Sequence, residues 1–174
     1  SWSYKIMALT LIATAGASDA KTYAPLDESN AYHESQVYGT NWVEEVDDEI
    51  KAQALVWATR LLDEKLSWVG QISDEGQALS WPRRYVVDKE GRLVADDIVP
   101  QFAKDATSEF ARLLVAADRT AENDTAGFKW LKIGTLGMGL DKNDRRPVMP
   151  PSVFSIVKFY ATLATGQPII LERM

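Results

Sequence analysis

A regular stripe of apolar residues between residues 47 and 66 constrains the fold more than any other part of the chain. Its members, at offsets of 0, 4, 7, 8 and 11, are Ile50, Ala54, Trp57, Ala58 and Leu61. This spacing marks one face of a helix with about 3.6 residues per turn. Such a face must be buried against other elements. The stripe therefore predicts a helix over 47–66 that packs into a core containing Trp57.

Prolines mark the starts of three further predicted helices. Proline is favoured at the first position of a helix, because no amide donor is lost there. The expected helices run over about 25–36, from 100 to about 119–123, and from the proline-rich linker 139–151 to Gly166. Together the four helices predict a mainly α fold, a small helical bundle with about four helices.

A β-hairpin is expected in the long connection between the second and third helices. Two runs rich in β-branched residues, 84–87 and 92–94, enclose the turn sequence Asp88-Lys89-Glu90-Gly91. Such runs around a turn that ends in glycine are typical of a hairpin. The predicted organisation is an N-terminal arm (1–24), a helical domain (25–165) with a hairpin insertion near 84–94, and an extended C-terminal tail (166–174).

The chain contains no cysteine and a single histidine, His33. Disulfides, thiolate catalysis and cysteine-based metal sites are therefore excluded, as is a site with several histidines. We expect no enzymatic activity, no cofactor and no bound metal. We interpret His33, beside Tyr32 on a short predicted helix, as a partly exposed packing residue. No apolar run reaches the roughly eighteen residues that a transmembrane helix needs.

Two motif-like segments have simpler structural interpretations. The acidic residues between 44 and 49 lack the spaced ligands and central glycine of a calcium loop. Acidic side chains are favoured at the start of a helix by its dipole, and a helix is predicted there. The glycine-rich segment 134–139 is not followed by the lysine and hydroxyl pair of a phosphate-binding loop, so we interpret it as a turn.

The formal net charge of −6 is unevenly distributed. Residues 1–127 hold 12 basic and 22 acidic side chains, a balance of −10, whereas residues 128–174 hold 7 and 3, a balance of +4. Binding to nucleic acid relies on cations that replace condensed counterions, so the overall balance argues against it. The basic final quarter suits an acidic partner surface instead.

Aromatic and cationic residues are adjacent in the segment Trp81-Pro82-Arg83-Arg84. Such neighbours can bind single-stranded nucleic acid by stacking and charge. An arginine near a tryptophan can equally pack within the protein by a cation–π contact. We assign Trp81, Pro82 and Arg83 to structural anchoring of the hairpin.

Four segments agree in order and spacing with one known family over roughly residues 8–165. The most specific is Gln77–Arg83. The others are Thr22–His33, Ala58–Asp63 with Trp68–Gly70, and Ile98–Pro100 with Lys104–Ala106, Glu109 and Ala111. Together they resemble the head–tail connector, or adaptor, proteins of tailed bacteriophages.

The resemblance implies a structural virion protein that takes part in viral assembly and DNA packaging. It implies a homo-oligomeric ring, commonly a dodecamer, at the head–tail interface of the virion, assembled in the host cytoplasm. The implied partners are other copies of the chain, the portal protein, and a stopper or tail protein. DNA would only pass through the channel that the ring extends, and no membrane is implied.

Two surfaces are predicted to serve these contacts. An apolar segment remains after the last predicted helix, so we assign portal binding to Gln167, Pro168, Ile169, Ile170, Leu171, Glu172 and Arg173. We assign the contact with a neighbouring subunit or tail-side protein to the hairpin residues Tyr85, Val86, Val87, Arg92, Leu93 and Val94.

A second hypothesis comes from a different functional class, a replication accessory protein that binds single-stranded DNA. Such a protein should show an affinity for DNA that falls steeply with salt. An enzyme is the third hypothesis, and it needs titratable pairs that the sequence hardly offers.

Overall fold

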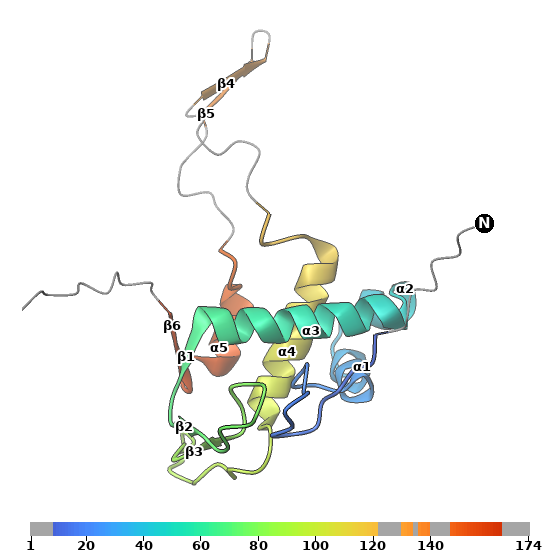
Figure 1. Ribbon diagram of the computed structural model, residues 1–174. Helices are drawn as coiled ribbons and strands as arrows, with labels where there is room; N and C mark the ends of the chain where they lie inside the picture. Colours follow the sequence, from blue (N-terminus) through green and yellow to red (C-terminus); the bar gives the residue numbers. More distant parts are fainter. Residues whose placement is uncertain (1–8, 122–129, 134–135, 140–146, 165–174) are drawn as a thin grey trace, which may run out of the picture.

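The computed structural model of the chain describes residues 9–121, 130–133, 136–139 and 147–164 (Figure 1). This part of the chain contains five α-helices and six short strands. The helices are α1 (Leu26–Glu34), α2 (Thr40–Glu45), α3 (Asp48–Lys65), α4 (Gln101–Ala116) and α5 (Pro151–Val157). The strands are β1 (Leu66–Trp68), β2 (Gln71–Ile72), β3 (Arg83–Arg84), β4 (Trp130–Ile133), β5 (Leu136–Gly139) and β6 (Ala161–Leu163).

Helices α3 and α4 cross at the centre of the molecule, and α5 packs beside α4 (Figure 1). Small side chains on α4 let the helices approach closely, and larger ones fill the space between them. The residues buried at this crossing include Leu55, Ala58, Leu62, Ala103, Ala106, Phe110, Val153 and Val157. The predicted mainly α fold with a β-hairpin is confirmed.

The prediction that Trp57 belongs to the core is wrong. Trp57 is 44% exposed, and it lines a shallow groove with Leu114 and Val115 of α4. The buried face of α3 is centred on Leu55 and Leu62 instead, both fully buried. Leu55 and Trp57 lie about 160° apart around the helix, since each residue advances by about 100°. Three members of the predicted stripe, Ala54, Ala58 and Leu61, are buried, whereas Ile50 and Trp57 are exposed. The buried face is therefore rotated from the predicted one toward Leu55 and Leu62.

The last helix ends earlier than expected. α5 stops at Val157, and the chain then extends as β6, which pairs antiparallel with β1 from Leu66↔Leu163 to Trp68↔Ala161. This pairing joins segments almost one hundred residues apart in the chain. The strand pairing thus takes the place of the last part of the predicted helix.

The connection from β1 to α4 is folded rather than loose. β2 pairs with β3, and the predicted hairpin over 84–94 consists of one antiparallel bridge, Val87↔Leu93. Backbone bonds from Asp88 to Arg92 (2.8 Å) and from Val94 to Val86 (2.9 Å) flank the bridge. A longer hairpin is formed by β4 and β5 and stands apart from the helices (Figure 1).

The predicted N-terminal arm is tied to the helical body at its end. Thr22, Tyr23 and Ala24 are buried, and the Tyr23 amide donates to the Thr59 hydroxyl of α3 (3.3 Å). The predicted C-terminal tail, residues 166–174, lies outside the described residues. None of the helices in the described part of the chain combines the length and apolar character needed to cross a membrane.

Candidate functional site

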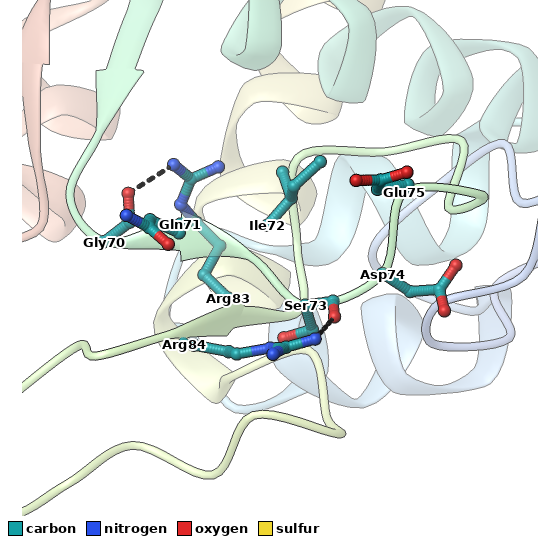
Figure 2. Close-up of a pocket in the computed structure, with 8 residues that line it drawn as sticks. All are labelled: Gly70, Gln71, Ile72, Ser73, Asp74, Glu75, Arg83 and Arg84. Atoms are coloured by element: carbon teal, nitrogen blue, oxygen red, sulfur yellow. Dashed lines mark hydrogen bonds between the residues drawn. The ribbon is translucent and has the colours of Figure 1, made fainter.

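An open cleft of about 830 Å³ lies between the β1–β2 turn and strand β3. Figure 2 shows its lining, which comes from two segments brought together by the β2–β3 pairing. The lining residues are Gly70, Gln71, Ile72, Ser73, Asp74, Glu75, Arg83 and Arg84. The cleft therefore combines backbone groups, amide and hydroxyl side chains, one apolar side chain and four charged ones.

Gly70 allows the tight turn that closes one end of the cleft. Its φ is +75°, and a Cβ atom there would stand 2.4 Å from the Arg84 carbonyl oxygen and 2.7 Å from Val86 Cγ2. Only glycine adopts this left-handed conformation without steric cost, and here it also avoids a backbone clash. The residue at position 70 thus determines how closely β3 approaches the turn.

Arg83 holds the cleft together through the backbone. Its guanidinium donates to the carbonyl oxygens of Val69 (2.7 Å), Gly70 (2.8 Å), Ser80 (3.1 Å) and Trp68 (3.4 Å). Burial lowers the pKa of Arg83 from its usual value, but arginine is not deprotonated in proteins, so the guanidinium keeps its charge. These donors are occupied by the protein, so Arg83 serves the shape of the cleft.

Asp63 of α3 fixes the chain segment that leads into Arg83. Its carboxylate accepts bonds from the Tyr23 hydroxyl, the Trp68 indole (3.0 Å) and the Ser80 amide (3.1 Å). Burial, followed by the charge of Asp63, raises the pKa of Tyr23 well above its usual value, so the hydroxyl remains a donor. Trp81, next in the chain after Ser80, is 1% exposed. The segment that leads into β3 is thereby attached to the main helix, α3.

Arg84 and Tyr85, the two residues after Arg83, are exposed to solvent. Arg84 is exposed and donates to the Ser73 carbonyl, as Figure 2 shows. No ion pair involves Arg84 among the described residues. Its guanidinium has five N–H donors, so several stay available to a ligand. It is the cationic group of the cleft that can meet an anion.

Tyr85 has a strained backbone and an exposed ring. Its φ is +61°, and it is the one residue other than glycine with positive φ in the described chain. The left-handed conformation costs an ordinary residue about 1–2 kcal/mol. The side chain is nevertheless 73% exposed, so burial does not compensate for this strain. Strained residues of this kind concentrate at functional sites.

Acidic groups make one wall of the cleft unsuitable for anions. Asp74 and Glu75 are exposed lining residues, and Asp74 Oδ1 accepts the Gly76 amide (2.7 Å). An anionic ligand would be repelled there and attracted at Arg84, whose guanidinium reaches the Ser73 carbonyl, next to Asp74 in the chain. The arrangement suits a ligand that has both a flat ring to stack on Tyr85 and a negative group to meet Arg84.

The structure distributes the predicted site residues unevenly. Of the predicted interface residues, Tyr85, Val87, Arg92 and Leu93 are exposed, whereas Val94 is half-buried and Val86 is fully buried. The predicted anchors Trp81 and Pro82 are buried, and Arg83 is half-buried. The predicted portal-binding residues Gln167–Arg173 lie outside the described residues.

His33 is not partly exposed as predicted but fully buried. Its ring lies between those of Tyr32 and Trp42, with centroid distances of 5.0 and 4.9 Å. Nε2 lies 3.0 Å from the Ser108 carbonyl oxygen, and burial lowers the pKa of His33. Because α1 packs directly on α4, the histidine is an internal residue.

Sequence reasoning missed the half of the cleft formed by residues 70–75. These residues carry no motif, and their place beside β3 follows from pairing across the intervening loop. A bulky residue at positive φ also has no sequence pattern, so Tyr85 could not be identified from its neighbours. Gly70, directly before Gln71, is the one feature of this stretch of sequence that indicates a tight turn.

Comparison with known protein families gives a match over most of the chain. A family model described as "Putative DnaT-like ssDNA binding protein" matches residues 7–169. No curated protein and no solved structure matches the chain.

This match overturns the resemblance to head–tail connector proteins of bacteriophages. It points to replication rather than to the virion, so the predicted ring of twelve copies and its location at the head–tail interface are wrong. The predicted partners, the portal protein and a stopper or tail protein, are therefore wrong as well. The prediction that DNA only passes through a channel is also wrong. The segments that suggested the connector family contain no motif specific enough to separate the two families.

Proposed function

Because the chain belongs to the family of DnaT-like ssDNA-binding proteins, we propose that it binds single-stranded DNA as a replication accessory protein, without chemistry of its own. The observation that carries this proposal is that the exposed Tyr85 directly follows Arg84, an exposed residue that lines the cleft and has N–H donors available to a ligand. A base stacks on the ring while the neighbouring phosphate meets the guanidinium. Arg84 lines the cleft, and Tyr85 is the next residue in the chain.

The exposed ring and the fixed backbone of Tyr85 support this assignment. Stacking of one base on an aromatic side chain contributes about 1–3 kcal/mol. The ring is 73% exposed in the free protein, so little protein contact must be broken before a base binds. Its backbone is fixed between β3 and the buried Val86, which reduces the entropy lost on binding.

The acidic character of residues 1–127 limits the electrostatic part of binding. With Arg84 as the main cation at the cleft, few phosphates are neutralised. For single strands, each neutralised phosphate contributes about −0.7 to the slope of log affinity against log salt. We therefore expect the affinity to fall roughly threefold per phosphate contact between about 50 and 200 mM salt. Stacking, which is less sensitive to salt, supplies the rest.

Fluorescence anisotropy with a labelled oligothymidine tests the proposal. Tyr85→Ala should weaken binding about 5- to 150-fold, the loss of one stacked base. Arg84→Ala should weaken binding and make the salt slope shallower by about 0.7. Matched controls are Tyr38→Ala, which removes another exposed tyrosine, and Arg60→Ala, which removes an exposed arginine of α3.

Two results would contradict the proposal. If the wild-type protein binds no oligothymidine at low salt, the function itself is wrong. If it binds but Tyr85→Ala and Arg84→Ala behave like the two controls, the cleft is not the site. Circular dichroism should show that all four variants are folded, because the substituted side chains are exposed or lie outside the core.

A further inference from the structure

We propose that the DNA-binding surface continues from the cleft across the β1–β2 turn to a second aromatic residue, Phe159, with Lys158 as its cation. A bound strand then runs from Tyr85 past Val69 to Phe159. This inference rests on the proposed function and extends it by a second contact region and a minimum length of DNA.

Hydrogen bonds connect the two ends of this path. The Val69 amide donates to the Tyr160 carbonyl (2.9 Å), next to Phe159 in the chain. The Val69 carbonyl in turn accepts from Arg83 Nε (2.7 Å), next to Arg84. The segment that carries Phe159 is therefore attached directly to the turn that forms one end of the cleft.

A row of aromatic rings supports Phe159 from below. Trp81, two residues before Arg83 in the chain, meets Phe102 edge to face at 5.3 Å, and Phe102 stacks on Tyr160 at 3.7 Å with an interplanar angle of 2°. Phe159 meets Tyr160 edge to face at 5.2 Å. The row begins at a buried residue and ends at a ring that is 56% exposed. Phe159 is thus held in place by one contact and still offers ring surface to solvent, as Tyr85 does.

The surface between the two rings suits a single strand of DNA. Val69 is 41% exposed and gives an apolar contact along the path. Lys158 is exposed, and it is the one charged residue between positions 147 and 164. This end of the path therefore attracts phosphates, in contrast to the wall formed by Asp74 and Glu75. Alternating aromatic and cationic groups are the pattern of surfaces that track a single strand.

The length of the oligonucleotide separates the two contact regions. We expect a strand of about four nucleotides to reach one aromatic residue at a time, and one of about sixteen to span both. When two contacts are linked through one strand, the second becomes intramolecular and raises the affinity. Phe159→Ala should therefore weaken binding of the long strand at least about fivefold, the lower limit for one stacked base. It should weaken binding of the short strand by no more than about twofold, since Tyr85 remains.

Further variants distinguish stacking from a general apolar contact. Phe159→Leu keeps apolar surface without a ring and should lose affinity for the long strand as Phe159→Ala does, whereas Phe159→Trp should retain it. Leu163→Ala, at a 49% exposed apolar residue of β6, is the matched control and should bind both strands normally. A photoreactive 5-iododeoxyuridine at either end of the long strand should cross-link to peptides that contain Tyr85 and Phe159.

Each outcome bears on a defined claim. If the wild type binds the long strand but Phe159→Ala binds it equally well and cross-links form only near Tyr85, the second region is refuted and the cleft remains. If Phe159→Leu binds as well as the wild type, stacking on Phe159 is refuted. If the wild type binds neither strand, the proposed function fails first and this extension fails with it.

Discussion

Replacement of Asp63 by alanine should destabilise the protein by about 4 kcal/mol. The carboxylate accepts three hydrogen bonds, from the Tyr23 hydroxyl, the Trp68 indole and the Ser80 amide. A hydrogen bond to a charged group contributes about 1.5–3 kcal/mol. The lower value for each of the three bonds gives a total of about 4.5 kcal/mol, and we reduce this to about 4 kcal/mol because Asp63 is only half-buried. This is a large part of the roughly 5–15 kcal/mol by which domains are stable.

Thermal and urea unfolding followed by circular dichroism measure this effect. For a chain of this size, 4 kcal/mol corresponds to a decrease in Tm of roughly 8–16 °C. The matched control is Glu64→Ala, at the next position of α3, where the carboxylate is exposed and pairs with Lys65. That change should alter the free energy of unfolding by less than about 0.5 kcal/mol.

A double-mutant cycle with Tyr23→Phe tests the cause. Tyr23→Phe should cost about 1.5 kcal/mol in the wild-type background and much less in the Asp63→Ala background, because its acceptor is already gone. If Asp63→Ala costs no more than Glu64→Ala, or if the two effects in the cycle simply add, the reasoning about this carboxylate is refuted.

Three further predictions concern glycine, tyrosine and histidine positions. Gly70→Ala should destabilise the protein by more than about 3 kcal/mol and abolish oligothymidine binding, because the added Cβ meets the Arg84 carbonyl. Gly91→Ala, at φ +81° in open space, should cost only the roughly 1–2 kcal/mol of left-handed strain. Equal losses of the two variants in urea unfolding would contradict this. Tyr85→Gly should weaken DNA binding. It should leave the free energy of unfolding unchanged or raise it by about 1 kcal/mol, since the backbone strain is relieved. A marked loss of stability would show that the ring supports the fold. Burial lowers the pKa of His33 in the folded state, so the unfolded state takes up the proton first, and stability should fall as the pH drops below about 6.5. His33→Gln should flatten this part of the curve of unfolding free energy against pH. An unchanged slope would refute the assignment.

The helices could be predicted where local chemistry determines them. Pro25 and Pro100 stand immediately before α1 and α4, and Pro151 is the first residue of α5. A fixed φ and a missing amide donor act at a single position, so one residue is enough to indicate a helix start. The mainly α fold follows from these starts and from the apolar stripes between them.

The candidate site depends on contacts that local patterns do not contain. The β2–β3 pairing and the β1–β6 pairing join distant segments, and both shape the surface around the cleft. The sequence indicated that aromatic and cationic residues meet near Trp81, but it could not separate Arg83 from Arg84. In the structure one guanidinium is occupied by carbonyl groups and the other is exposed, because successive residues of a strand point to opposite faces.

The bonds of Arg83 to main-chain carbonyls have a consequence for how the surface can vary. Every residue type offers the same carbonyl oxygen, so this clamp does not depend on which side chains stand at Val69 or Ser80. Side chains along the cleft can therefore be exchanged, to tune which nucleotides are preferred, while the loop keeps its path. Engineered libraries at Gln71, Ile72 and Ser73 should accordingly yield mostly folded proteins with altered ligand preference.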